Sequence, residues 1–216
     1  MAPSHVTASR STAREAQRAL EGRPGARRHL ALAAGALLAL AACSTPPPQP
    51  PSGFEPIAAT FDQDTEGWTS TEPASPAWEA PGHLVVVDDG SSWQYAVASA
   101  AFAGDWTGAE AIRFRVMADE GPMQFPLRVV VTGSAHALYV EYPLDALTPG
   151  GWVMLSAPFA EGTWRRFVDE DSEGALATQA EIDEAIANVA DLRIRLDLND
   201  KFTGDEVNRL DDVVVE

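Results

Sequence analysis

The sequence predicts a mainly β protein, an antiparallel β-sandwich with one short helix near residues 179–189. Two observations favour this fold. Several short stretches alternate apolar and charged residues with the period of two that a half-buried strand requires, as in 112–116 and 192–198. Clusters of Gly, Pro, Asp and Ser separate these stretches, as they do in turns between strands. Many short strands with a single late helix are typical of an antiparallel sandwich.

One helix is predicted near the end of the chain. Thr178 and Glu181 have the spacing of a capping box, with Thr178 as the N-cap and Glu181 as the third helical residue. Apolar residues then recur on one face from Ile182 to Val189. The remaining strand candidates are 57–61, 83–87, 94–98, 127–131, 138–142, 152–157 and 210–215.

The first part of the chain has the pattern of an export signal. Arg27 and Arg28 precede thirteen uncharged residues, 30–42, whereas a membrane-spanning helix needs about 20 apolar residues. The run fits the apolar core of a secretory signal, and it ends in small residues before Cys43, the only cysteine of the chain. The alternative is an ordinary signal peptide that happens to end near a cysteine.

The sequence Leu40-Ala41-Ala42-Cys43 resembles the lipobox of bacterial lipoproteins. The resemblance implies that residues 1–42 are a lipoprotein signal peptide, cut before Cys43, and that the Cys43 sulfur carries a lipid. Residues 43–56 would be the lipid anchor and a proline-rich linker, because proline favours extended polyproline II. Residues 57–216 would then form an extracytoplasmic domain at the cell envelope, anchored in the outer membrane if one is present.

The charge of the chain bounds its partners. The net charge is −17, and six of the 15 basic residues but only two of the 32 acidic residues precede Cys43. The exported part is therefore strongly acidic and repels the phosphates of nucleic acids, which excludes nucleic acid as an expected partner. Such a surface attracts cations such as calcium, although it also serves plain solubility.

The order of short motifs within 57–216 carries a family resemblance. The motifs are Gly67-Trp68, Gly104-Asp105-Trp106, the capped helix with 192–194 behind it, and a closing 210–213 of sequence LDDV. This order resembles the laminin domain IV (laminin B) family and related galactose-binding-like jelly rolls. The resemblance implies a jelly-roll sandwich over 57–216. The laminin-type EGF modules of the animal proteins are absent from this sequence, so the resemblance does not extend to laminin function.

Five carboxylates suggest a structural calcium as a cofactor. Asp62, Asp64 and Glu66 alternate before a glycine, as at the start of a calcium loop. Related jelly rolls often hold calcium where the first and last strands meet, so the resemblance brings these residues near Asp211 or Asp212. Strand alternation points one of these two aspartates inward, where it needs a partner. A solvated acidic turn is the alternative.

A polar ligand-binding face is predicted from residues on the outward phases of strands and in loops. Arginines on adjoining strands supply forked donors for sugar hydroxyls or carboxylates, and exposed tryptophan rings stack against sugars. Cross-strand ion pairs and core packing are the alternatives. The candidate residues are Arg113, Arg115, Arg193, Arg195, Tyr139, Glu141, Asp197, Trp78 and Trp93.

Together these observations predict an envelope-anchored, non-catalytic protein that binds carbohydrate or another envelope ligand, either a glycan or a protein. The sequence contains neither G-x-S-x-G nor H-E-x-x-H, so it is not expected to be an enzyme. Two alternatives stay open. One is a structural or assembly partner in the envelope. The other is a weak glycoside hydrolase, whose two carboxylates would lie about 5–9 Å apart in a cleft.

Overall fold

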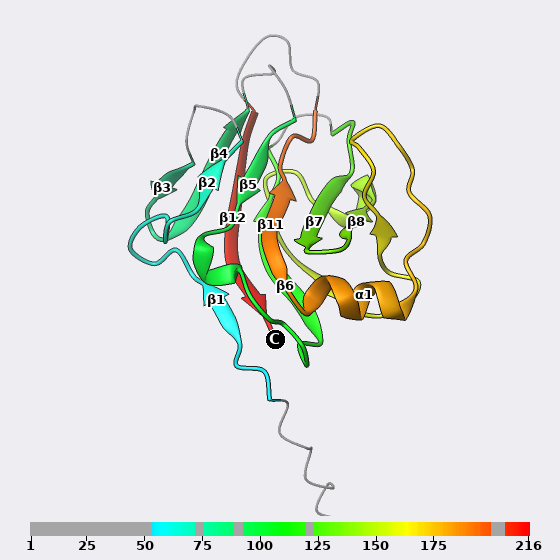
Figure 1. Ribbon diagram of the computed structural model, residues 1–216. Helices are drawn as coiled ribbons and strands as arrows, with labels where there is room; N and C mark the ends of the chain where they lie inside the picture. Colours follow the sequence, from blue (N-terminus) through cyan, green and yellow to red (C-terminus); the bar gives the residue numbers. More distant parts are fainter. Residues whose placement is uncertain (1–52, 72–75, 89–92, 120–122, 200–205) are drawn as a thin grey trace, which may run out of the picture. The chain divides into compact units, whose positions relative to one another are not determined.

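The computed structural model describes residues 53–71, 76–88, 93–119, 123–199 and 206–216, which belong to one compact unit, Pro47–Glu216. Within these residues the chain forms two antiparallel six-stranded sheets and one α-helix (Figure 1). The predicted mainly β, antiparallel sandwich is therefore confirmed. The predicted signal peptide, Cys43 and most of the proline-rich linker lie outside the described residues.

Sheet A is built around its longest strand, β12. The first half of β12 pairs with β4 and its last residues pair with β1, while β6 runs along the other side and carries β9 at the sheet edge. The strands of sheet A are β1 (Ile57–Ala59), β3 (Ala77–Glu79), β4 (His83–Asp88), β6 (Ala111–Met117), β9 (Trp152–Pro158) and β12 (Glu206–Val215).

Sheet B has the order β10-β8-β7-β11-β5-β2, and each pair in it is antiparallel. Two short 3-10 turns, Ala100–Phe102 and Leu144–Ala146, lie between strands. The strands of sheet B are β2 (Thr69–Ser70), β5 (Tyr95–Val97), β7 (Leu127–Gly133), β8 (Ala137–Tyr142), β10 (Arg165–Arg166) and β11 (Val189–Arg195).

The main core lies between the two sheets and follows the alternation of the sequence. In β11, Leu192 and Ile194 are buried in this core while Arg193 points to the opposite face. Three tryptophans are also part of it, and two of them satisfy their indole N–H groups with backbone carbonyls, as buried tryptophans usually do. These core tryptophans are Trp68, Trp106 and Trp164.

Helix α1 (Gln179–Ile186) is close to the prediction and has the predicted capping box, in which Thr178 and Glu181 each bond the backbone of the other. It ends three residues before the predicted end, because Val189 already pairs with Gly104 at the start of β11. The helix packs on sheet B through a buried face of Ile182, Ala185 and Ile186.

Strand β12 departs from simple alternation at its two aspartates. The register between β12 and β6 shifts between Asp211 and Val214, and Asp212 has a φ of 48°, which identifies a β-bulge. Leu210 and Val213 both enter the core, so both aspartates remain on the outer side, where each lies near Arg115. The expectation that one aspartate points inward is therefore wrong, since the bulge inserts an extra residue between the two inward positions.

Candidate binding faces of the two sheets

The predicted arginines do not share one face. Arg113 and Arg115 lie on β6 in sheet A, whereas Arg193 and Arg195 lie on β11 in sheet B. Each pair points away from the core, as its alternation predicts, but the two sheets turn their outer faces in opposite directions. The single face predicted for these four residues is therefore wrong, and the structure offers two separate faces.

The outer face of sheet B gathers most of the predicted ligand residues on a second, smaller apolar cluster. Tyr95, Val130 and Tyr139 form this cluster, and Trp93 and Phe167 pack against it. Three arginines lie over its rings, with ring-centroid distances of 4.6 Å for Arg128 over Tyr139, 4.5 Å for Arg195 over Trp93 and 5.4 Å for Arg193 over Tyr95. Arg128 lies on β7, beside β11, and faces outward as the alternation of its strand predicts.

Residues 167–174, here called the acidic segment, cover this face. The Glu170 Oε2 atom accepts hydrogen bonds from the Tyr95 hydroxyl at 2.6 Å and from Arg128 Nη1 at 3.0 Å, and it lies 3.6 Å from Arg195 Nη1. The Tyr139 hydroxyl accepts a hydrogen bond from the Gly174 amide. As a result, only 1% of Tyr139 and 2% of Arg195 are exposed, and the face is closed by the chain itself.

Burial has electrostatic consequences under the acidic segment. Burial, together with the hydrogen bond to Glu170, raises the pKa of the Tyr95 hydroxyl. Burial and the nearby charge of Arg128 lower the pKa of the Arg195 guanidinium. Arg128 also donates to Glu141 from Nε and Nη2, so the predicted partner Glu141 neutralises Arg128 at the edge of this face. Ionised groups are thus held close together in a desolvated layer.

The outer face of sheet A is more open and carries a tryptophan that the sequence analysis did not select. The guanidinium of Arg115 lies 4.9 Å from the ring centroid of Trp152, and the His83 ring meets the same indole edge-on at 5.6 Å. Strand alternation is the signal that could have found this residue. Leu155 and Ala157 are core positions of β9, so Trp152 belongs to the outward phase.

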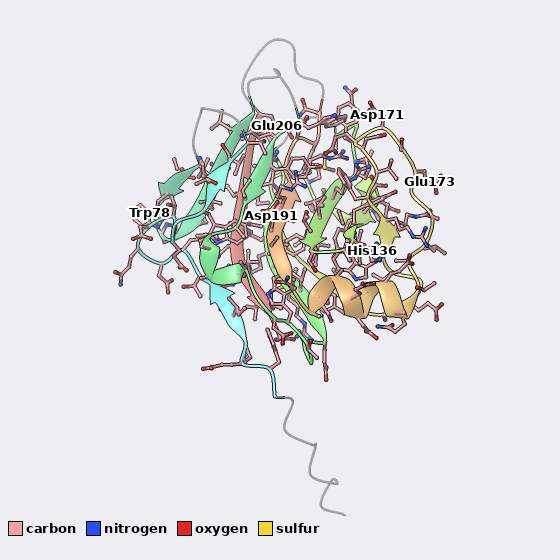
Figure 2. All side chains as sticks on the ribbon, viewed as in Figure 1. Trp78, His136, Asp171, Glu173, Asp191 and Glu206 are labelled. Carbon is pink, nitrogen blue, oxygen red and sulfur yellow. The ribbon has the colours of Figure 1, made fainter. Side chains whose placement is uncertain are left out.

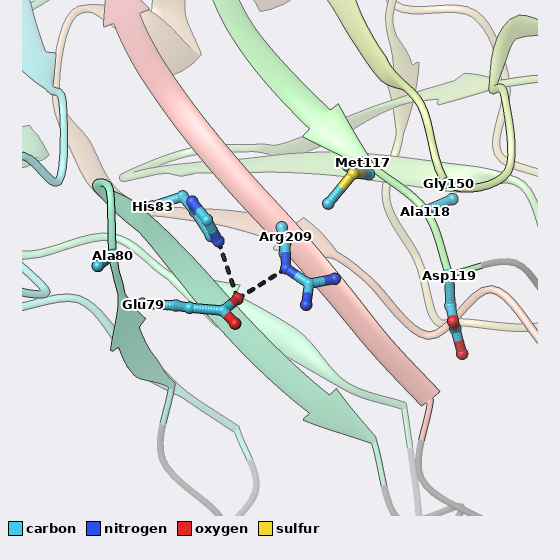
Figure 3. Close-up of a pocket in the computed structure, with 8 residues that line it drawn as sticks. All are labelled: Glu79, Ala80, His83, Met117, Ala118, Asp119, Gly150 and Arg209. Atoms are coloured by element: carbon cyan, nitrogen blue, oxygen red, sulfur yellow. Dashed lines mark hydrogen bonds and ion pairs between the residues drawn. The ribbon is translucent and has the colours of Figure 1, made fainter.

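A depression of about 400 Å³ lies on this side of sheet A (Figure 3). On its wall the Glu79 Oε2 atom lies 2.9 Å from His83 Nε2 and accepts a hydrogen bond from Arg209 Nε at 2.8 Å, so three strands meet at one carboxylate. These hydrogen bonds from Arg209 and His83 hold the pKa of Glu79 below its ordinary value. The lining residues are Glu79, Ala80, His83, Met117, Ala118, Asp119, Gly150 and Arg209.

Two predicted ligand residues lie apart from both faces or at their margins. Trp78 is 39% exposed at the edge strand β3, and its Nε1 donates to the Phe61 carbonyl at 2.6 Å. Its neighbour Glu79 points to the other side of β3, so Trp78 does not line the depression. Asp197 is buried just after the end of β11.

The five carboxylates of the predicted calcium site have local partners. Glu66 Oε1 accepts hydrogen bonds from the backbone amides of Thr60 and Phe61, and Asp64 accepts one from the Glu66 amide. Asp62 accepts a bond from the Thr60 hydroxyl, whereas Asp211 and Asp212 pair with Arg115. In the described ranges, no three His, Cys, Asp or Glu side chains come together as a metal site. Calcium binding stays a prediction.

The described part of the chain contains no helix long and apolar enough to cross a membrane. The lipid on Cys43 stays a prediction, because Cys43 precedes the described residues.

Comparison with known proteins supports the fold. No family model matches the chain, and no curated protein matches it either. Among solved structures, the L4b domain of human laminin alpha-2 is similar, with 12% identity over 76% of this chain and 99% of that domain and a TM-score of 0.57. A family 11 carbohydrate-binding module of a cellulosomal cellulase from Clostridium thermocellum has 16% identity over 75% and 94% of the two chains, with a TM-score of 0.48. The likeness to the L4b domain supports the jelly-roll sandwich that the laminin-like motifs predicted.

Proposed function

We propose that this chain is an envelope lipoprotein, tethered through Cys43, whose sandwich binds carbohydrate without catalysis on the outer face of sheet A. The observation that carries the proposal is the position of the half-buried Trp152 on the outer face of sheet A, in contact with His83 of the depression wall. Sugar rings have apolar faces that stack on an aromatic ring, while their hydroxyls need hydrogen-bond partners around it. The depression also falls in the range of about 300–1,000 Å³ that is typical of small-ligand sites.

The polar groups around Trp152 suit neutral or hydroxyl-rich ligands. Arg115 and Arg209 present guanidinium donors, and Glu79 presents a carboxylate acceptor, so both kinds of partner for a hydroxyl are at hand. The side chain of Arg115 is 35% exposed and that of Glu79 is 48% exposed, which leaves their polar atoms accessible to a ligand.

The electrostatics favour binding over hydrolysis. A glycosidase needs a carboxylic acid whose raised pKa keeps it protonated as the general acid. The pKa of Glu79 is lowered instead, because Arg209 and His83 stabilise its ionised form. Burial does raise the pKa of Asp211, but that carboxyl is already bonded to the Asp212 amide and lies near Arg115. The release of reducing sugar from a bound glycan would support the hydrolase in place of the binding protein.

The assembly-partner alternative needs a continuous exposed apolar patch. The large exposed apolar residues in the described ranges come instead from separate segments, and two of them, Trp78 and Met154, lie on opposite edge strands of sheet A. The exposed large apolar residues are Trp78, Met154, Val168 and Leu176.

A glycan array followed by calorimetric titration tests the binding function, using the full chain purified in detergent. If the indole loses about 80 Å² of accessible area on stacking, the gain at about 25 cal/mol per Å² is roughly 2 kcal/mol, or about 30-fold in Kd. Trp152→Ala should weaken binding by about that factor. Trp78→Ala is the matched control, because it removes an exposed indole from the same sheet on the side away from the depression. Equal losses in both variants would contradict the proposed site.

The tether is tested separately. Wild-type protein expressed in a bacterial host should partition with membranes and detergent, and intact mass should show a lipid on Cys43. Cys43→Ala should remain an uncleaved precursor without lipid. A soluble, unmodified chain that is cut elsewhere would contradict the lipoprotein assignment.

A further inference from the structure

We propose that the outer face of sheet B is a second, self-occupied binding site for glycans that carry carboxylates, and that Glu170 holds the place of the ligand's carboxylate. This site lies on the opposite sheet from the proposed carbohydrate face, so it goes beyond the function proposed above. Its floor is formed by Tyr95, Arg128, Tyr139 and Arg195, and the acidic segment covers it.

The first argument is the convergence of donors on a single carboxylate. Tyr95 comes from β5, Arg128 from β7 and Arg195 from β11, and all three side chains reach the same Oε2 atom of Glu170. Forked guanidinium donors are well suited to carboxylates, and these donors are fixed by burial on three neighbouring strands. The donors that bind the carboxylate therefore lie on the sheet, and the acidic segment supplies only the carboxylate that they bind.

The second argument concerns Phe167, which occupies the position that suits a sugar ring. Its ring meets Tyr139 edge-on at 6.1 Å, and the guanidinium groups of Arg128 and Arg193 each lie 5.9 Å from its centroid. The acidic segment thus places an apolar ring and a carboxylate, three residues apart, over a floor of aromatic rings and arginines. A uronic acid combines the same two features in one residue, because its pyranose ring has an apolar face and carries a carboxylate.

The third argument is that the acidic segment does not provide a hydrogen-bond acceptor for every buried donor of this site. Arg195 is 2% exposed, and its Nη2 donates to the Pro126 carbonyl, but within the described ranges its buried Nε has no hydrogen-bond partner. Buried donors are normally paired, so an orphaned one in a site marks a place for an acceptor that the resident segment does not supply. A ligand with several acceptors can fill this place.

The fourth argument is the weak attachment of the segment. Phe167 is tied to β8 through its amide and the Ala137 carbonyl, and Gly174 is tied to Tyr139, so the two ends are anchored. Between them the segment contacts sheet B through Glu170 and through an exposed ion pair of Glu173 with Arg165 at 2.9 Å, while Val168 is 67% exposed and Asp171 is exposed as well (Figure 2). The middle of the segment can therefore lift, and the Phe167 ring can turn aside about its own side-chain torsions, while the anchored backbone ends and the strands stay in place.

The test uses the full chain in detergent with three probes: tetragalacturonate, the same tetrasaccharide with its carboxyls reduced to alcohols, and poly-glutamate. Glu170→Gln weakens the resident contact and keeps its shape, so this variant should bind tetragalacturonate about 10-fold more tightly than wild type. Asp171→Asn is the matched control, because it removes an exposed acid of the same segment and should leave the Kd unchanged. Glu170→Gln combined with Arg128→Met should lose the binding.

A second measurement covers the case in which a variant does not fold. Tetragalacturonate should speed hydrogen exchange at the amides of residues 168–173 in the wild-type protein, because the ligand displaces the segment. Unchanged exchange, or equal Kd values for wild type and Glu170→Gln, would overturn the proposal. So would tighter binding of the reduced tetrasaccharide or of poly-glutamate. None of these outcomes bears on the sheet A proposal. That proposal is tested separately, by the loss of glycan binding in Trp152→Ala.

Discussion

Gly133 is the position at which the docking of helix α1 can be tested most directly. A Cβ atom at this position would lie 2.4 Å from the carbonyl oxygen of Ala185 and 2.7 Å from its Cα, whereas ordinary contacts begin near 3.4 Å. Gly133→Ala therefore requires the helix to move away from β7 by about 1 Å. Overpacking of this kind typically costs about 1–3 kcal/mol, and the shift also loosens the contacts of Ile182 and Ile186 with the core.

We expect Gly133→Ala to lower the free energy of unfolding by about 3 kcal/mol, the upper end of that range, because the clash involves backbone atoms that cannot rotate away. For a domain of this size about 1 kcal/mol corresponds to roughly 2–4 °C in Tm, so Tm should fall by about 6–12 °C. Thermal unfolding followed by circular dichroism measures the change. Gly53→Ala is the control, since no atom lies within 4 Å of its Cβ position. Equal Tm values for Gly133→Ala and wild type would refute the close packing of helix and strand.

Three further predictions concern the cap, the depression and calcium. Thr178→Ala removes the N-cap acceptor and should lower stability by about 1 kcal/mol in urea unfolding; no change would contradict a working capping box. Because the folded-state pKa of Glu79 is lowered, its contribution is present above the ordinary value of 4.5 and is lost as the pH falls through the lowered pKa. Glu79→Gln should therefore flatten the fall of Tm below about pH 4.5, and parallel curves would argue against the contacts with Arg209 and His83. If calcium binds as the sequence predicts, Tm should rise with calcium, and Asp62→Ala with Asp212→Ala should abolish the response; identical melting in calcium and chelator would exclude the site.

Local sequence was sufficient for the elements whose signals are local. The capping residues Thr178 and Glu181 predicted the start of the helix, because a cap involves atoms only three residues apart. Alternation in 192–195 correctly separated core residues from outward arginines. The same alternation failed in β12, where the left-handed conformation of Asp212 inserts a bulge. An aspartate accepts that conformation without a distinctive sequence signal, so pairing with β6 was needed to reveal it.

The sequence by itself determined that this chain is a β-sandwich with outward arginines, since periodicity and turn residues act along the chain. It could not determine which outward residues share a surface. Arg113 and Arg193 occupy equivalent phases of equally regular strands, but long-range pairing assigns β6 and β11 to different sheets. Only the tertiary structure placed Glu170 over the arginines of sheet B and left Trp152 half-buried beside Arg115 on sheet A. The physical reason is that a strand's own pattern specifies inside and outside, whereas its neighbours and its cover are fixed by contacts between residues far apart in the chain.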